Sequence, residues 1–408
     1  MIPSDSIIRR LLKLRPSQRT DEALYYILAP HLLGFWTFVK PKHAGEEFGD
    51  VIFAFGDTCF IFEAKTRELP EKTSESWIRS KIKEAAAQIT TNYGKLSTGQ
   101  IPHLRNSWRG EVKWDSSGIK HYFGIIVLMH SSEPYDPRDI SSEIFEKSPI
   151  PLQAISLKDM GELMRLMNTP WDFVIYWEFR HSLGMSHKLP VHEENRIYAT
   201  ILTNWIELAR NQGIVENDTD LIEHQQFLKS YTQTVMNEGE VDELTKKAIA
   251  DSYLLDIAAG SVVKKAEKDA SGKRVGSEIH DFLVNSVEQI VAIDRRRRAM
   301  YGRLWVECAS KCISSQDYSW VSAYSPSRDI SYILNARPGV ALDQTLLIDK
   351  MKKQMAIDGT SCVLGLSATA VNIFATREDI LATIKGSNKA ELEDDLVLNP
   401  TAAFIERV

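Results

Sequence analysis

Residues 49–65 constrain the fold of this chain more than any other segment. They read GDVIFAFGDTCFIFEAK, so two apolar runs flank the dipeptide Gly56-Asp57. A glycine at the first position of a two-residue connection suits a type II′ turn between antiparallel strands. We therefore predict a β-hairpin in which Phe55 pairs with Thr58.

Alternation along the two strands assigns the hairpin side chains to two faces. One face is almost entirely large and apolar: Val51, Phe53, Phe55, Phe60, Phe62 and Ala64. The other face carries Asp50, Ile52, Ala54, Cys59, Ile61, Glu63 and Lys65. Asp50 then lies opposite Glu63, and a slip of one residue would put these two carboxylates on opposite faces.

Asp50, Glu63 and Lys65 therefore gather at the open end of the hairpin. Facing Cα atoms in an antiparallel pair are about 4.5–5.5 Å apart, and two carboxylates that close repel each other. A divalent cation removes this conflict by binding both, and it can polarise a phosphate and activate a water. The grouping predicts phosphodiester hydrolysis, whereas a solvated ion pair on a strand is the ordinary alternative.

A coarse pass along the chain predicts alternating helices and strands. In the N-terminal half we expect helices at 20–36 and 74–93, a buried strand at 121–129, and two helices within 157–185 that separate before Pro170. In the C-terminal part we expect a long helix at 277–314, strands at 318–324, 330–336 and 361–366, and helices at 342–357 and 376–385. The fold class is α/β.

The N-terminal region resembles the PD-(D/E)XK nuclease superfamily, including its RecB-like and Cas4-like members. The matching pieces are Gly49-Asp50 and Glu63-Ala64-Lys65 after twelve intervening residues, in the order helix, hairpin, helix, strand. The resemblance covers residues 20–130. It implies a restriction-endonuclease-like αβββαβ core that cuts DNA with Mg²⁺ or Mn²⁺.

The resemblance also implies roles for single residues. Asp50, Glu63 and the backbone carbonyl of Ala64 would hold the metal, and Lys65 would be the catalytic lysine. A glutamate of the first helix often joins the metal in this family; Glu22 is the candidate, with Glu46 and Glu47 as rivals. Gln88 corresponds to the glutamine of a Gln-x-x-x-Tyr motif, although Tyr93 follows it after four residues instead of three.

Basic residues outside the hairpin are candidates for contacts with nucleic acid. Lys81 lies beside the apolar stripe of the helix at 74–93, seven residues before Gln88. Arg295, Arg296, Arg297 and Arg298 form a run of four within the predicted helix 277–314. Four consecutive helical positions cover all sides of a helix, so a solvated turn paired with acidic neighbours is the alternative.

Length and composition limit the number of domains, the kind of partner and the cellular location that we expect. With 408 residues, several domains are expected, and we assign a nuclease domain to 1–185, a helical connecting region to 186–275 and an α/β domain to 276–408. The formal charge of −6 argues against non-specific coating of nucleic acid. Four scattered cysteines, no signal-peptide pattern and no long apolar run predict a cytoplasmic protein without a membrane contact.

The function expected from the sequence is a metal-dependent DNA nuclease, with RNA not excluded as the substrate. A nuclease joined to an unfamiliar α/β domain is a layout seen in anti-phage defence and restriction, and the second domain would recognise a target, bind a partner protein or form a homo-oligomer. The alternative is a catalytically inactive module of the same fold that binds nucleic acid or protein.

Overall fold

The computed structural model describes residues 23–28, 34–43, 46–66, 75–129, 144–186, 194–202, 243–270, 287–325, 329–339, 344–384 and 401–406, with short gaps inside some of these ranges. It divides into two compact units, Met1–Tyr198 and Ala199–Val408. Each unit combines helices with a mixed β-sheet, so the α/β class is confirmed.

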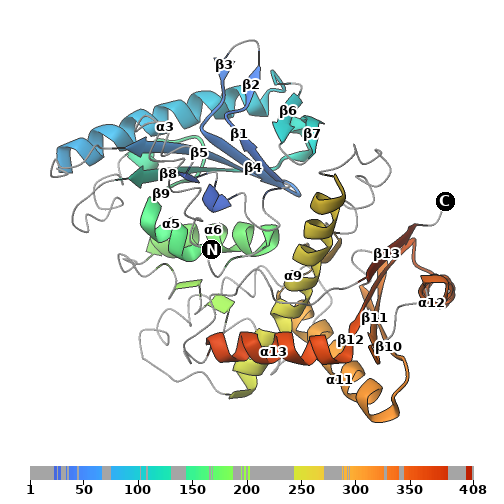
Figure 1. Cartoon of the computed structure of the whole chain (residues 1–408). Coiled ribbons are helices and arrows are strands. Elements are labelled where there is room, and N and C mark those ends of the chain that lie inside the picture. Colours follow the sequence, from blue (N-terminus) through green and yellow to red (C-terminus); the bar gives the residue numbers. More distant parts are fainter. Residues whose placement is uncertain are drawn as a thin grey trace. The chain divides into compact units, whose positions relative to one another are not determined.

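Unit 1 is built on a five-stranded sheet (Figure 1). In spatial order its strands are β1 (Thr37–Val39), β4 (Val51–Phe55), β5 (Thr58–Thr66), β8 (His121–Met129) and β9 (Leu152–Ser156). The first three strands are antiparallel, and β8 and β9 continue parallel to β5. The parallel step from β5 to β8 is made through the long helix α3 (Glu75–Ser97), as a crossover between parallel strands requires.

The predicted hairpin register is confirmed. Phe55 pairs with Thr58 and Val51 pairs with Phe62 across β4 and β5. Gly56 has a φ of 59° at the first turn position, which a glycine adopts without strain. Turn chemistry and side-chain alternation therefore specified one register together.

The two predicted faces of the hairpin are confirmed as well. Phe53 and Phe60 contact Phe173 of α6 (Pro170–Ser186), with ring centroids 4.8 Å and 5.3 Å apart. The opposite face, with Ile52 and Ile61, joins one buried apolar cluster with the inner side of α3. The strand pair is thus covered on both faces, and only its ends can present polar side chains.

Shorter elements complete unit 1. Two small hairpins pair β2 (Lys42–His43) with β3 (Glu46–Glu47) and β6 (His103–Asn106) with β7 (Gly110–Lys113), and a 3₁₀ turn, η2, spans Ser116–Gly118. Helix α5 (Leu157–Leu163) precedes α6, so the predicted separation before Pro170 is confirmed. Thr169 accepts a hydrogen bond from the amide of Asp172, which caps the start of α6.

Unit 2 contains a four-stranded sheet and the long helices α9, α11, α12 and α13 (Figure 1). Its elements are α9 (Glu243–Ala270), α11 (Arg295–Ser315), β10 (Ser319–Ser325), β11 (Ile330–Arg337), α12 (Gln344–Asp358), β12 (Cys362–Thr369), α13 (Ala370–Ile384) and β13 (Thr401–Glu406). Strands β11 and β12 are parallel, and β10 and β13 add antiparallel edges. The sequence predicted the first three strands, and it missed β13.

Helix α9 packs against α11 and α13. It falls within the region 186–275 that we expected to be a connector, but it belongs to the packed core of unit 2. At the contact with α11, a Cβ on Gly302 would come within 1.8 Å of the carbonyl oxygen of Asp251. Glycine at this position therefore sets the close approach of the two helices.

None of the described helices is long and apolar enough to span a bilayer.

Candidate active site

The C-terminal end of β5 places Glu63 and Lys65 on the face of the sheet that α3 covers. The Glu63 side chain is 6% exposed and that of Lys65 is 12% exposed. The ammonium Nζ of Lys65 lies 3.6 Å from Oε2 of Glu63. Because strand side chains alternate, these two residues share a side while the intervening Ala64 turns away.

Asp50 is fixed next to this end of β5 by backbone contacts. Its amide donates to the carbonyl of Phe62 at 3.1 Å, and its carboxylate oxygen Oδ2 accepts from the amide of Ala64 at 2.7 Å. Gly49 has a φ of 89°, and a Cβ there would lie 3.3 Å from the Phe62 carbonyl oxygen. Glycine before Asp50 therefore lets the chain enter β4 with the carboxylate against β5.

Lys65 is surrounded by acceptors from α3. Its ammonium donates a hydrogen bond to Oε1 of Gln88 and lies 3.4 Å from Oε1 of Glu84. With Glu63, two carboxylates and one amide oxygen surround this amine. The structure thus brings Glu63, Lys65 and Gln88 into contact, and it holds the carboxylate of Asp50 on the amide of Ala64, between Glu63 and Lys65 in the chain.

Asn92 is a member of the cluster that sequence reasoning missed. Its side chain is buried, and its Nδ2 donates to Oε1 of Glu63 at 3.1 Å. Asn92 follows Gln88 by four residues, one helical turn, so it occupies the place of the tyrosine in Gln-x-x-x-Tyr. Tyr93 instead packs on Tyr122, with ring centroids 5.1 Å apart. Helical spacing alone would have identified Asn92.

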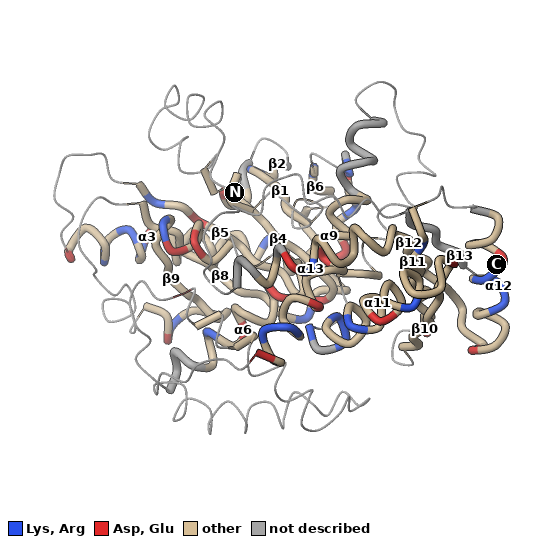
Figure 2. The backbone as a smooth tube through the Cα atoms, turned by 60° about the horizontal axis from the view of Figure 1, so that its bottom comes forward, with Lys and Arg blue, Asp and Glu red and all other residues tan. Residues whose placement is uncertain are grey.

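Glu84 is the second member that the sequence did not reveal. Its Oε2 lies 2.6 Å from Nζ of Lys81, and its other oxygen faces Lys65. The hydrogen bond from Lys81, together with the charge of Lys65, lowers the pKa of Glu84 although partial burial opposes this shift. Figure 2 shows basic and acidic residues along α3. Lys81, Glu84, Gln88 and Asn92 recur every three or four positions and form one polar stripe on this helix.

Some expected site residues cannot be placed in this cluster. Glu22 lies outside the described residues, and the side chains of Glu46 and Glu47 are not described although their backbone forms β3. No role for these three glutamates follows from the geometry.

The arginine run requires a correction. Arg295 and Arg298 are 0% exposed, and each places Nη1 2.6 Å from a different oxygen of Asp256. Side chains buried in this way cannot reach a nucleic acid, so the contact expected of these two arginines is wrong for this structure. The side chain of Arg296 is not described, and Arg297 is partly exposed on α11.

The oxygen atoms at the end of β5 form a small set of possible ligands for a hard cation. Among the described residues, no group of three or more acidic, histidine or cysteine side chains is arranged to hold a metal ion. Asp50, Glu63 and the Ala64 carbonyl offer two carboxylates and one backbone oxygen. Mg²⁺ commonly uses one or two carboxylates and completes its shell with water and phosphate oxygens, so this set fits such an ion.

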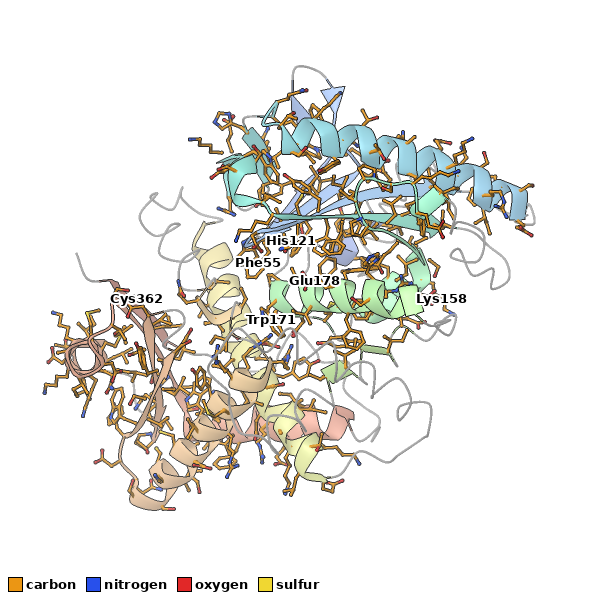
Figure 3. The ribbon with its side chains drawn as sticks, turned by 180° about the vertical axis from the view of Figure 1, so that it is seen from behind. Phe55, His121, Lys158, Trp171, Glu178 and Cys362 are labelled. Carbon is orange, nitrogen blue, oxygen red and sulfur yellow. The ribbon has the colours of Figure 1, made fainter. Side chains whose placement is uncertain are left out.

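A second titratable pair lies at the opposite end of the same sheet. Figure 3 shows Glu178 of α6 close to His121, the first residue of β8, which pairs with Thr58 at the start of β5. Burial raises the pKa of Glu178, and the charge of His121 opposes this only in part. The lysine at this end, Lys120, lies 3.3 Å from Asp57, and we assign this end no catalytic role.

Comparison of the chain with protein families, with curated proteins and with solved structures finds no match in any of the three.

Proposed function

We propose that this chain is a metal-dependent nuclease that hydrolyses phosphodiester bonds of DNA. The single observation that carries the proposal is the convergence of Asp50, Glu63 and Lys65 at the end of one hairpin, with Gln88 of α3 bonded to the lysine. Two oxygen-bearing side chains beside a fixed cation suit a reaction that builds negative charge on a phosphate.

The topology of unit 1 supports the same proposal. Residues 23, 24 and 26–28 are helical, and β1, β4, β5, α3 and β8 follow in chain order. This order corresponds to the αβββαβ core that the resemblance implies. Asp50 directly precedes the second strand, and the other candidate residues lie on the third strand and the following helix, which is where that core would carry its site.

Each residue has a distinct task in the proposed reaction. Asp50 and Glu63, with the Ala64 carbonyl, would hold Mg²⁺ or Mn²⁺, which when bound polarises the phosphate and lowers the pKa of an attacking water. Lys65 contributes a fixed positive charge where the phosphate oxygens become more negative. Gln88 orients the lysine by accepting a hydrogen bond from its ammonium, and Asn92 orients Glu63 by donating a hydrogen bond to its Oε1.

The test is cleavage of linear duplex, circular duplex and single-stranded DNA, with Mg²⁺ and with EDTA. We expect wild-type cleavage that EDTA abolishes, and a loss of about a thousandfold or more in Asp50→Asn and in Glu63→Gln, because each substitution removes a metal-binding charge. Asp57→Asn is the matched control, since this exposed carboxylate at the turn pairs with Lys120. Normal cutting by either site variant would reject the assignment.

A second candidate function is a non-catalytic module that binds nucleic acid or protein. The observation in its favour is the absence of a third acidic ligand among the described residues. Under this alternative the full chain would bind DNA without any Mg²⁺-dependent cleavage of the three substrates.

A further inference from the structure

The carboxylate of Glu84 bridges two lysines at the rim of the candidate site. Oε2 lies 2.6 Å from Nζ of Lys81, and Oε1 lies 3.4 Å from Nζ of Lys65. Lys81 and Glu84 are neighbours on α3, whereas Lys65 reaches them from β5. Two ammonium groups from different elements therefore converge on one anion.

The three side chains of this bridge differ in their exposure to solvent. The side chain of Lys65 is 12% exposed, that of Lys81 33% and that of Glu84 45%. The anion is the most accessible of the three groups, so it can rotate away without unpacking the core. The two lysines would then face the opening together.

A phosphodiester has the charge and the two oxygen atoms that this lysine pair can bind. It carries one negative charge spread over two oxygens, as a carboxylate does, and lysine ammonium groups bind phosphate as point charges. In the free protein Glu84 is the carboxylate that contacts both lysines, whereas the second carboxylate beside Lys65, that of Glu63, belongs to the candidate metal site.

We propose that Lys65 and Lys81 form a binding site for one backbone phosphate of DNA, and that Glu84 occupies this site in the free protein and is displaced when DNA binds. The inference rests on the proposed function, since it places the substrate beside the candidate catalytic residues. The lowered pKa of Glu84 agrees with a carboxylate that remains charged, and therefore competes, at neutral pH.

The test is DNA binding by the full chain in EDTA, measured by fluorescence anisotropy with labelled 20-nucleotide single-stranded and duplex DNA. The variant Glu84→Gln removes the competing charge and keeps the side-chain length. Glu75→Gln is the matched control, because Glu75 is an exposed carboxylate of the same helix, paired with Arg79. Both variants change the net charge equally.

We expect Glu84→Gln to bind DNA about three- to tenfold more tightly than wild type, and Glu75→Gln to change affinity less than twofold. The logarithmic salt dependence should steepen by about one unit in Glu84→Gln, since no displaced carboxylate takes up a cation from solution when DNA binds. Adding Lys81→Ala to Glu84→Gln should cancel both gains.

Equal affinities for Glu84→Gln and Glu75→Gln, weaker binding by Glu84→Gln, or no binding by any form would overturn the inference. So would a loss of Mn²⁺ binding in Glu84→Gln, which would make Glu84 a metal ligand. The outcome is separable from the nuclease proposal because binding in EDTA requires no cleavage. Tighter DNA binding by Glu84→Gln without any cleavage by wild type would support the phosphate-binding site and would contradict the nuclease proposal.

Discussion

Two clusters in this molecule have the same arrangement, a carboxylate between two cationic side chains, yet they differ in how far a ligand can reach them. In unit 2, Asp256 lies between Arg295 and Arg298, with side chains 2%, 0% and 0% exposed. In unit 1, Glu84 lies between Lys81 and Lys65 and is the most exposed member of its group. We call these the closed cluster and the open cluster.

The difference teaches how burial separates a structural charge from a functional one. Within the closed cluster, Arg295 also donates to Ser252 and stacks 4.3 Å from the ring centroid of Tyr253, so its guanidinium is fixed by several partners. Removing one member of such a buried group leaves a charge without compensation. In the open cluster, water can replace a lost partner, and a ligand can do the same.

The largest expected effect breaks the closed cluster. Asp256→Asn should lower the free energy of unfolding by about 3 kcal/mol, because two buried guanidinium groups lose their shared carboxylate. Thermal melting and denaturant unfolding of the full chain measure this loss. Glu84→Gln, the corresponding change in the open cluster, should cost only a few tenths of a kcal/mol. Similar losses in the two variants would contradict the distinction.

An intermediate effect is expected at Asn92, the buried end of the polar stripe. Asn92→Leu removes the donor to Oε1 of Glu63, and we expect a loss of about 2 kcal/mol in stability because the acceptor is a carboxylate in a buried place. As a positioning residue, Asn92 should also set metal affinity, which we expect to fall about tenfold for Mn²⁺. Thr91→Val, on the exposed side of the same turn, is the control. A stability loss with unchanged Mn²⁺ affinity would leave Asn92 a purely structural role.

The smallest effect is a pH dependence in the open cluster. The pKa of Glu84 is lowered in the folded chain, chiefly by the hydrogen bond from Lys81, so the folded state favours the charged form. The ionised Glu84 carboxylate therefore adds to the free energy of unfolding above the unfolded pKa near 4.5. This contribution to stability is lost as the pH falls through the lower pKa of the folded state. Solvent screening limits it to a few tenths of a kcal/mol. The stability difference between wild type and Glu84→Gln should be present at pH 7 and should shrink as the pH falls below 4.5. A difference that grows towards acid pH would contradict this sign.

The hairpin and its faces could be predicted because every determinant is local. Gly56-Asp57 sets the turn, and alternation of large apolar residues with small or polar ones sets the faces. Gln88 could be placed for the same reason, since helical spacing on α3 is regular. Asn92 lies on the same stripe. It was missed because the motif Gln-x-x-x-Tyr ends in a tyrosine, and the nearest tyrosine, Tyr93, lies one residue further along the chain.

What could not be predicted depends on contacts between distant segments. The partner of Arg295 and Arg298 is Asp256, about forty residues earlier, and no local pattern distinguishes a buried arginine from a solvated one. Strand β13 pairs with β12 across more than thirty residues of chain, and its short segment carries no strong strand signal of its own. Glu84 could not be distinguished from an ordinary helical surface glutamate until Lys65 was placed beside α3.

The most direct test of the account is calorimetric titration of Mn²⁺ into the full chain and into Glu63→Gln, with Asp57→Asn as the control. The account predicts saturable binding by wild type and the control, and a loss of at least about tenfold in affinity for Glu63→Gln. Binding that is equally strong in Glu63→Gln, or no binding by wild type, would show that the end of β5 holds no catalytic metal.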